Sequence, residues 1–296
     1  MTRLGWAVGV LAAVLVGGCA GAQPGGGPGA TPTGVPTTPA VPSEPGVASA
    51  TVAVYYLGNE RVWQEGNGQP VDRVKLYREF HRGPAGDGGP RDRTVKAVTE
   101  MLDGSSAYDP DYRTGWPSGA RVLEVRIDGA TVTVDIGGAE RNNVGAEVAD
   151  QAVQQLIWTV TAASGKTGVR LLLDGAEVSE LWGHVAVGGV LRRAPALDVL
   201  AHVWLIDPQH DATVGRTFTV HVSGAVFEST IQLRVRQTDR TVLQRFVTVS
   251  APAGGQFGEA KTDVTLPPGT YTIEAYAESA VDGRPQFLDN HTIRVQ

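Results

Sequence analysis

One loop gathers the side chains best suited to contact a ligand. Between residues 105 and 119, in a chain that is only 6% aromatic, lie five candidate ligand-binding residues: Tyr108, Asp109, Asp111, Tyr112 and Trp116. Aromatic rings can stack on sugar rings while carboxylates accept hydrogen bonds from the hydroxyls, and the same set can anchor a protein partner. Large aromatic side chains are, however, mostly buried in folded proteins. The favoured interpretation is therefore that Trp116 and one tyrosine fold back onto a sheet edge.

The histidines do not follow a metal-binding pattern. They stand at positions 81, 184, 202, 210, 221 and 291, no His-Glu-x-x-His motif is present, and a single cysteine cannot supply a thiolate set. The tightest local group is His210 with Asp207 and Asp211, but the run Asp-Pro-Gln-His-Asp is also an ordinary turn. We predict no metal and no other cofactor.

Motifs for catalysis and for nucleotide binding are also missing. The chain has no Gly-x-Ser-x-Gly elbow, and Glu228 has no second acid nearby in sequence with which to act as a pair. The run Ser164-Gly165-Lys166-Thr167 resembles the end of a phosphate-binding loop, but Val160 stands where the first glycine belongs. In addition, a helical pattern precedes this run and a strand pattern follows it, the reverse of the required order. We predict no catalytic residue and no nucleotide partner.

The single cysteine lies where a lipid could be attached. Residues 1–19 carry Arg3 and then a short apolar run, as a secretory signal does. The run ends in Leu15-Val16-Gly17-Gly18-Cys19, which resembles the lipobox of bacterial lipoproteins, and an ordinary signal with a chance cysteine is the alternative. The resemblance implies lipidation of Cys19 and anchoring at the outer face of the cytoplasmic membrane.

A low-complexity segment follows the cysteine. Residues 20–49 are rich in Gly, Pro, Thr and Ala and cannot bury enough apolar surface to offset the entropy of ordering, so we predict a disordered tether. Without Arg3 the chain has 24 Lys and Arg against 31 Asp and Glu, a net charge of −7. This acidity excludes a general attraction for nucleic acid.

Two folded domains fit the remaining length, with a boundary predicted between residues 197 and 198. Residues 50–197 predict an α+β mixed sheet with two helices. Strands are expected at 51–57, 71–81, 122–127, 132–136 and 168–173, with an Asp-Gly hairpin turn at 128–129. One helix is expected to start at an Asp92 cap and end at Gly104; the other spans 149–160 and is capped by Gly165. Both helices are expected on one face of the sheet.

Residues 198–296 predict an all-β immunoglobulin-like sandwich. Seven short alternating strands are expected, at 203–206, 218–222, 230–235, 242–249, 262–266, 270–277 and 291–295. The aromatic residues Phe227, Phe257 and Tyr271 are expected in the core or at its corners. Because only one cysteine is present, packing alone must hold the two sheets together.

Several short segments of the sequence resemble those of known families. The first domain is similar to the GerMN domain in five segments, from its predicted helices, hairpin and strands: TVKAVTEMLDG, WPSGARVL, VRIDGATVTVDI, DQAVQQLIWTVTA and GVRLLLDGAEV. GerMN domains occur in sporulation and spore-germination lipoproteins and in actinobacterial envelope lipoproteins. The second domain resembles the immunoglobulin-like domain that often follows GerMN, through VSGAVFEST, GQF, PGTY and ESAVDG.

These resemblances imply a non-catalytic, lipid-anchored envelope protein that acts as a binding or scaffold module. Its expected partners are the lipid bilayer, through acylated Cys19, and other envelope proteins. The alternative is a protein that binds peptidoglycan or another glycan through the 105–119 loop. An unrecognised hydrolase is the third hypothesis, and it has the least support because no activated nucleophile or acid pair stands in a recognisable context.

Overall fold

The first strands of the fold form a sheet of their own. The computed structural model describes residues 50–63, 69–85, 88–251, 255–280 and 282–296, so Cys19 and the predicted tether lie outside the described residues. Strands β1 (Thr51–Trp63) and β2 (Pro70–Arg82) pair antiparallel along their whole length. Both strands are longer than the sequence predicts, and Val52 to Leu57 of β1 are buried without interruption.

A mixed sheet contains the hairpin that the sequence predicts. Its order is β3 (Arg121–Asp128), β4 (Thr131–Gly137), β5 (Gly168–Leu173) and β6 (Ala176–Glu177). Strands β3 and β4 are antiparallel and turn at Gly129, whose φ of 55° suits glycine. Strands β4 and β5 run parallel, and the second helix connects them. The predicted α+β fold with a mixed sheet is confirmed.

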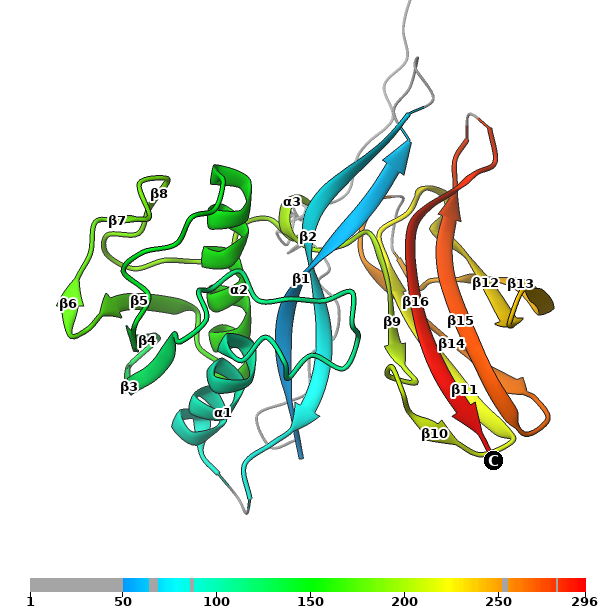
Figure 1. Ribbon diagram of the computed structural model, residues 1–296, viewed down its shortest axis with the longest axis horizontal. Helices are drawn as coiled ribbons and strands as arrows, with labels where there is room; N and C mark the ends of the chain where they lie inside the picture. The colour runs from blue at the N-terminus through cyan, green and yellow to red at the C-terminus, as the bar shows by residue number, and fades with distance from the viewer. Residues whose placement is uncertain (1–49, 64–68, 86–87, 252–254, 281) are drawn as a thin grey trace, which may run out of the picture. The chain divides into compact units, whose positions relative to one another are not determined.

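Two helices lie between these two sheets (Figure 1). Helix α1 (Pro90–Leu102) contacts β1 and β3, and helix α2 (Ala146–Ser164) contacts β1 on one side and β5 on another. Helix α2 is consequently buried on all sides along most of its length. Both helices lie on one side of the mixed sheet, as predicted, but the prediction that the first two strands belong to that sheet is wrong, because β1 and β2 form a separate layer on the other side of the helices.

The end of α2 agrees with the sequence prediction, whereas the start of α1 differs from it. Gly165 ends α2 in the left-handed conformation, with φ 69°, and its N–H donates to Thr161 O. Helix α1 begins at an N-cap of Gly89 followed by Pro90, so Asp92 is not the cap. Pro90 has no N–H to satisfy and starts the helix, while Asp92 lies in the first turn, where its charge favours the helix dipole.

Short elements lead from the first half to the second: β7 (Glu180–Leu181), β8 (Val185–Ala186) and α3 (Ala196–Val199). The second half is a sandwich of a three-stranded and a five-stranded sheet. The first has the order β14 (Gly258–Thr265), β11 (Thr217–Gly224), β9 (Val203–Asp207); the second has the order β10 (Thr213–Val214), β16 (Pro285–Val295), β15 (Gly269–Glu278), β12 (Thr230–Gln237), β13 (Arg240–Thr248). All seven predicted strands are present, and the predicted sandwich is confirmed.

Two of the three predicted core aromatics are buried. Phe257 and Tyr271 are buried, and the Tyr271 hydroxyl donates to Pro267 O at 3.0 Å. Phe227 is 83% exposed, so its predicted place in the core is wrong. It opens a short 3₁₀ turn, η1 (Phe227–Ser229), in which Glu228 and Ser229 both have positive φ, and this turn directs the ring away from the sandwich.

The two halves share a hydrophobic core. Trp204, Ile206 and Phe257 of the sandwich belong to the same buried cluster as the residues around α1 and α2. A β-bridge between Leu76 and Leu200 lies at the same junction. The described residues accordingly fall within one compact unit.

Candidate functional site

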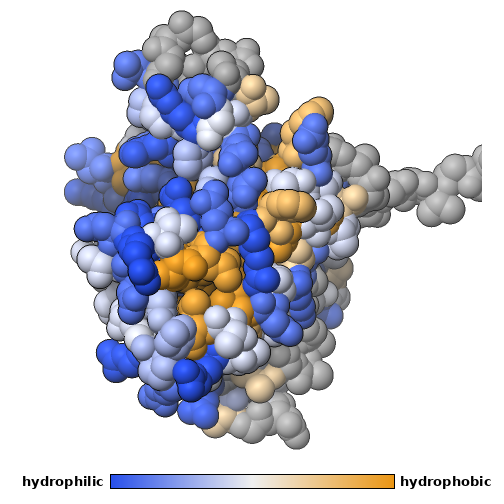
Figure 2. All heavy atoms as spheres, turned by 90° about the vertical axis from the view of Figure 1, so that its right-hand side faces the viewer, coloured by the Kyte–Doolittle hydropathy of each residue, from blue (hydrophilic) through white to orange (hydrophobic). Residues whose placement is uncertain are grey.

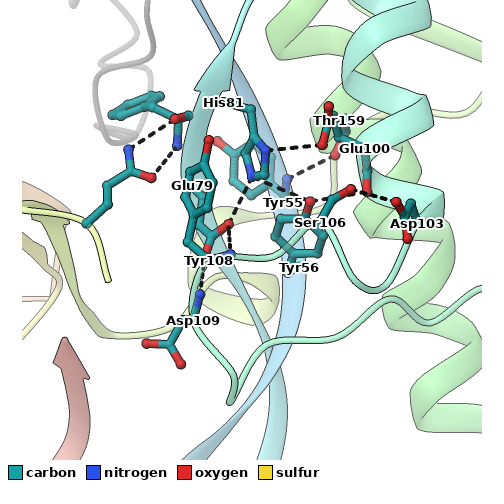
Figure 3. Close-up of polar contacts among 12 residues, drawn as sticks. Tyr55, Tyr56, Glu79, His81, Glu100, Asp103, Ser106, Tyr108, Asp109 and Thr159 are labelled. Carbon is teal, nitrogen blue, oxygen red and sulfur yellow. Dashed lines mark hydrogen bonds and ion pairs between the residues drawn. The ribbon is translucent and has the colours of Figure 1, made fainter. Parts of the chain in front are cut away.

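The predicted loop is held at its start by one buried carboxylate (Figure 3). Glu79 of β2 accepts the backbone N–H groups of Tyr108, at 3.0 Å, and Asp109, at 2.9 Å. Its Oε2 also lies 2.9 Å from Nε2 of His81, and His81 reaches Glu100 of α1 with its other nitrogen at 3.4 Å. A sheet, a helix and the loop are thus joined by a single chain of polar contacts.

The loop residues divide into exposed and buried sets. Tyr108 is 43% exposed and stacks on His81 with 4.4 Å between ring centroids, and Asp111 is also exposed. Asp109, Tyr112 and Trp116 are buried. The expectation that Trp116 and one tyrosine fold back is confirmed by their burial, although Trp116 packs on helix α2 and not on a sheet edge.

Trp116 and Tyr112 fold back onto different partners. The indole N–H of Trp116 donates to Ala152 O of α2 at 3.1 Å, and its ring meets Trp182 edge-on. The Tyr112 ring stacks on Tyr77 with centroids 4.8 Å apart. Its hydroxyl points toward the second half of the fold and donates to Oδ1 of Asp289 on β16 at 2.8 Å. We call the buried region around this contact, where the two halves meet, the junction.

The junction contains two buried carboxyl groups. Asp289 receives the Tyr112 hydroxyl on one oxygen and the N–H of Leu205 on the other, at 2.7 Å. Asp109 receives the N–H of Asp111 on Oδ1 at 2.8 Å. The two groups come from opposite halves of the fold, and each is oriented by a hydrogen bond on at least one oxygen.

Two histidines face these carboxyl groups. Nδ1 of His291 lies 2.7 Å from Pro208 O, so this nitrogen carries the proton and Nε2 does not. Nε2 of His291 lies 3.8 Å from Oδ2 of Asp109, and Nδ1 of His210 lies 3.2 Å from the same oxygen. One ligand atom each from Asp109, Asp289 and His291 falls within 4.8 Å of the others, so these residues are the ones that could hold a metal ion.

Burial changes the proton affinities of this cluster. It raises the pKa of Asp109 to about 6 and the pKa of Asp289 to about 7, because a charged carboxylate loses its hydration inside the junction. The same loss of hydration lowers the pKa of His291, since burial disfavours the imidazolium. Near neutral pH, the carboxyl groups of Asp109 and Asp289 are therefore present in both protonated and ionised forms.

This balance predicts a pH-dependent stability. Because the pKa of Asp289 is higher in the folded chain than in the unfolded one, the folded chain holds more protons between about pH 4 and pH 7. The stability that this group contributes is fully present below that window and is lost as the pH rises through it. In metal-free buffer, the free energy of unfolding of the wild type should fall by roughly 2–3 kcal/mol relative to Asp289→Asn between pH 5 and pH 8.

Denaturant unfolding of both proteins at several pH values measures this difference. Because both proteins share the groups remote from the junction, the contributions of those groups to the pH dependence of unfolding cancel in the comparison. The comparison also reduces the contribution of His291, whose lowered pKa changes the stability in the opposite direction. A constant difference across pH 5 to 8 would show that Asp289 does not titrate in the folded chain.

A second polar contact closes the other end of the junction. Glu60 of β1 is fully buried and accepts the N–H of His202 at 2.5 Å, and its carboxylate also lies 2.9 Å from Nδ1 of His202. Beside it, the Trp63 indole N–H donates to Pro285 O at 2.9 Å. Lys75 donates to Leu197 O and Asp198 O in the connection between the halves.

The sequence identifies only part of this site. It singles out Asp109 and Tyr112 as loop residues, but Asp289, His291 and Glu60 carry no local motif. The group of His210 with Asp207 and Asp211 is noted as a turn; in the structure, Asp109 lies nearer to His210 Nδ1, at 3.2 Å, than Asp211 does to its Nε2, at 3.9 Å. Asp109 and His210 are 101 positions apart in the chain, and Tyr112 and Asp289 are 177 positions apart. No rule based on residue spacing predicts such contacts.

Two family models match the chain. Residues 53–179 match the model described as sporulation and spore germination, and residues 202–284 match the immunoglobulin-like domain of bacterial spore germination. The chain joins a GerMN domain to a spore-germination immunoglobulin-like domain. The junction described above thus lies between the GerMN domain and the immunoglobulin-like domain.

Solved structures resemble parts of the chain. The first GerMN domain of the sporulation protein GerM from Bacillus subtilis is 20% identical, covers 49% of this chain and 98% of its own, and has a TM-score of 0.35. The tandem GerMN domains of the same protein are 17% identical and cover 67% of this chain and 59% of their own, with a TM-score of 0.37. A candidate lipoprotein from Clostridium perfringens is 10% identical, covers 52% and 93%, and has a TM-score of 0.33. These scores are too low to support an argument about function.

No curated protein matches the chain in sequence. Within the part of the chain that the structure describes, no helix is both long and apolar enough to cross a bilayer.

Proposed function

We propose that this chain is a lipid-anchored, non-catalytic protein of the bacterial cell envelope that binds a protein partner through its immunoglobulin-like domain. The two germination-type domains support an envelope role of this kind. The observation that carries the binding role is an open, apolar strand at the edge of the sandwich.

Strand β13 is the last strand of the five-stranded sheet, and among the described residues it pairs only with β12. A strand added by a partner would pair with the outer edge of β13, beside the point where Arg245 donates to Asp263 O of β14. Its Phe246 is 65% exposed, and Val242, Leu243 and Val247 are only half-buried. Exposed apolar side chains along an unpaired edge are the features that β-strand addition by a partner uses.

The side of the molecule on which this strand lies has an apolar centre. Strand β13 lies at the right of Figure 1, the side that Figure 2 turns toward the viewer. Figure 2 shows apolar side chains gathered in the middle of this face with polar residues around them. An apolar centre with a polar rim is the usual anatomy of a protein-binding surface.

Site-specific crosslinking in intact cells tests this role. A photoreactive amino acid at Phe246 should give a discrete protein adduct, whereas the same group at Leu123 of the GerMN domain, 45% exposed, is the matched control. Replacing Thr248, which is exposed two residues beyond Phe246 on the same strand, by Asp in the Phe246 crosslinking chain should reduce the adduct at least about tenfold, because a charge would then lie in the docking strand.

Two outcomes would contradict the role. One is equal crosslinking from Phe246 and Leu123. The other is the absence of any protein adduct from Phe246 together with saturable, salt-tolerant sedimentation of the chain with purified peptidoglycan. The second outcome would show that the chain binds the peptidoglycan of the cell wall instead of a protein partner.

The lipid anchor is a separate part of the proposal. Its support is the sequence Leu15 to Cys19, with the small residues Gly17 and Gly18 before the only cysteine. Cys19→Ala should move the protein from the membrane fraction to the soluble or secreted fraction, because one acyl-modified residue is the proposed attachment. Fractionation and labelling with a fatty-acid analogue measure this, and unchanged membrane association with no label would contradict it.

A further inference from the structure

We propose that the junction between the two domains binds one divalent transition-metal ion, of the class that Zn²⁺ represents, through Asp109, Asp289 and His291. The three side chains are 1%, 5% and 3% exposed, and they come from both domains. A bound ion would therefore join the GerMN domain to the immunoglobulin-like domain.

The separations between ligand atoms are close to those that such an ion needs. One ligand atom from each residue lies within 4.8 Å of the others, and the Asp109 Oδ2 to His291 Nε2 distance is 3.8 Å. Ligand atoms about 2.0–2.1 Å from a tetrahedral zinc ion lie about 3.4 Å from one another. Movements of about 1 Å would bring the three atoms to these positions.

The ligand atoms already have suitable chemistry and orientation. His291 donates its Nδ1 proton to Pro208 O, which leaves the Nε2 lone pair toward Asp109. A metal-binding histidine commonly makes this contact with a backbone carbonyl, because it fixes both the tautomer and the ring orientation. The Tyr112 hydroxyl and the Leu205 N–H orient Asp289 in the same way, and the Asp111 N–H orients Asp109.

The local charge also favours a cation. Two carboxyl groups are buried close together, and among the described residues neither forms an ion pair with a lysine or arginine. Burial raises the pKa of both groups, and a neighbouring carboxylate raises each of them further: Asp289 for Asp109, and Asp111 for Asp289. His210, with Nδ1 at 3.2 Å from Asp109 Oδ2, is the nearest candidate for a fourth ligand. Imidazole with carboxylate ligands favours zinc-like ions over calcium or magnesium.

Calorimetric titration of the full chain with Zn²⁺ tests the site. The protein carries Cys19→Ser and no histidine tag, and it is first treated with a chelator, so neither a thiol nor a tag can bind the ion and the protein starts without metal. We expect one equivalent of Zn²⁺ to bind and to raise the Tm, while Ca²⁺ and Mg²⁺ do neither. No heat and no change in Tm with Zn²⁺, or equal binding of Ca²⁺, would overturn the proposal.

Variants locate the ion. Asp109→Asn and His291→Gln should each weaken Zn²⁺ binding at least about tenfold. Asp239→Asn and His184→Gln, both at exposed positions, are the matched controls and should bind as the wild type does. Wild-type affinity in both Asp109→Asn and His291→Gln would overturn the assignment.

Spectroscopy keeps the proposal testable if the junction variants fail to fold. X-ray absorption of the zinc-loaded Cys19→Ser chain should show a first shell of oxygen and nitrogen only, with the outer-shell scattering of imidazole. A shell without imidazole would contradict the role of His291.

Discussion

Replacing Asp289 by alanine should lower the free energy of unfolding by about 2–4 kcal/mol and separate the unfolding of the two domains. The variant leaves the Tyr112 hydroxyl and the Leu205 N–H without their acceptor inside the junction. Each buried donor left unsatisfied costs about 1–3 kcal/mol. The Tyr112 bond crosses between the domains, whereas the Leu205 bond joins β9 to β16 inside the immunoglobulin-like domain, so the loss of Asp289 weakens both the contact between the domains and the immunoglobulin-like domain.

Thermal unfolding followed by calorimetry measures both effects. The wild type should unfold in one transition, and Asp289→Ala should show a lower first transition that a second one follows. Asp239→Ala is the matched control, since the Asp239 side chain is 98% exposed, and it should stay within about 0.5 kcal/mol of the wild type. A single transition at the wild-type temperature for Asp289→Ala would show that the junction contact contributes little.

Replacing Trp158 by alanine should cost about 3–5 kcal/mol, the largest effect expected for a single side chain in this fold. Trp158 lies on α2 in the layer between the two sheets of the GerMN domain and is 1% exposed. Its ring packs against Tyr55 of β1 at 5.5 Å, and the Arg193 guanidinium lies 4.1 Å from its centroid on another side. Alanine would leave a cavity that α2, held by strands on both sides, cannot close.

Two substitutions check the reason for this effect. Phe246→Ala truncates an aromatic ring that is 65% exposed and should change stability by about 0.5 kcal/mol or less. Trp158→Phe should cost far less than alanine, because most of the ring remains and the indole N–H, which has no hydrogen-bond partner among the described residues, is removed. Chemical denaturation measures all three. A cost below 1 kcal/mol for Trp158→Ala would contradict the packing described for α2.

Local patterns predict most of the fold. The Asp128-Gly129 turn, the helical period before Gly165 and the seven strands of the immunoglobulin-like domain are each encoded within about 20 residues, and all are present. The separate layer of β1 and β2 is not predicted, because the period of a strand reports its buried face and not which sheet it joins. Phe227 shows the same limit, since the backbone conformation of the following residues decides its exposure.

The junction is the part that local patterns cannot report. Tyr112 and Asp109 are recognisable as unusual loop residues, yet their partners Asp289, His291 and His210 lie in another domain. Nothing in the sequence around Asp289 marks it as a site residue. Its role comes from its burial and from the two hydrogen bonds that it accepts in the folded chain. The loop that the sequence offers as a ligand-binding surface has much of its polar chemistry directed inward, toward the domain junction.

The junction also bears on the proposed binding role. A partner bound along β13 would be presented by the immunoglobulin-like domain, and the buried contacts of Tyr112 with Asp289 and of Glu60 with His202 connect that domain to the GerMN domain. If the domains form one folding unit, the buried contacts hold the proposed binding strand in a fixed position relative to the GerMN domain. These contacts predict that the two domains fold as one unit.

Hydrogen exchange of the intact chain, followed by mass spectrometry, tests this claim most directly. The informative peptides cover residues 108–116 of the GerMN loop, 203–207 of β9 and 286–295 of β16. We predict that buried amides in all three exchange at one common slow rate under native conditions, and that Asp289→Ala speeds the exchange of 203–207 and 286–295 ahead of the α2 peptide 152–163. Exchange of β9 and β16 much faster than the GerMN loop in the wild type would contradict the claim.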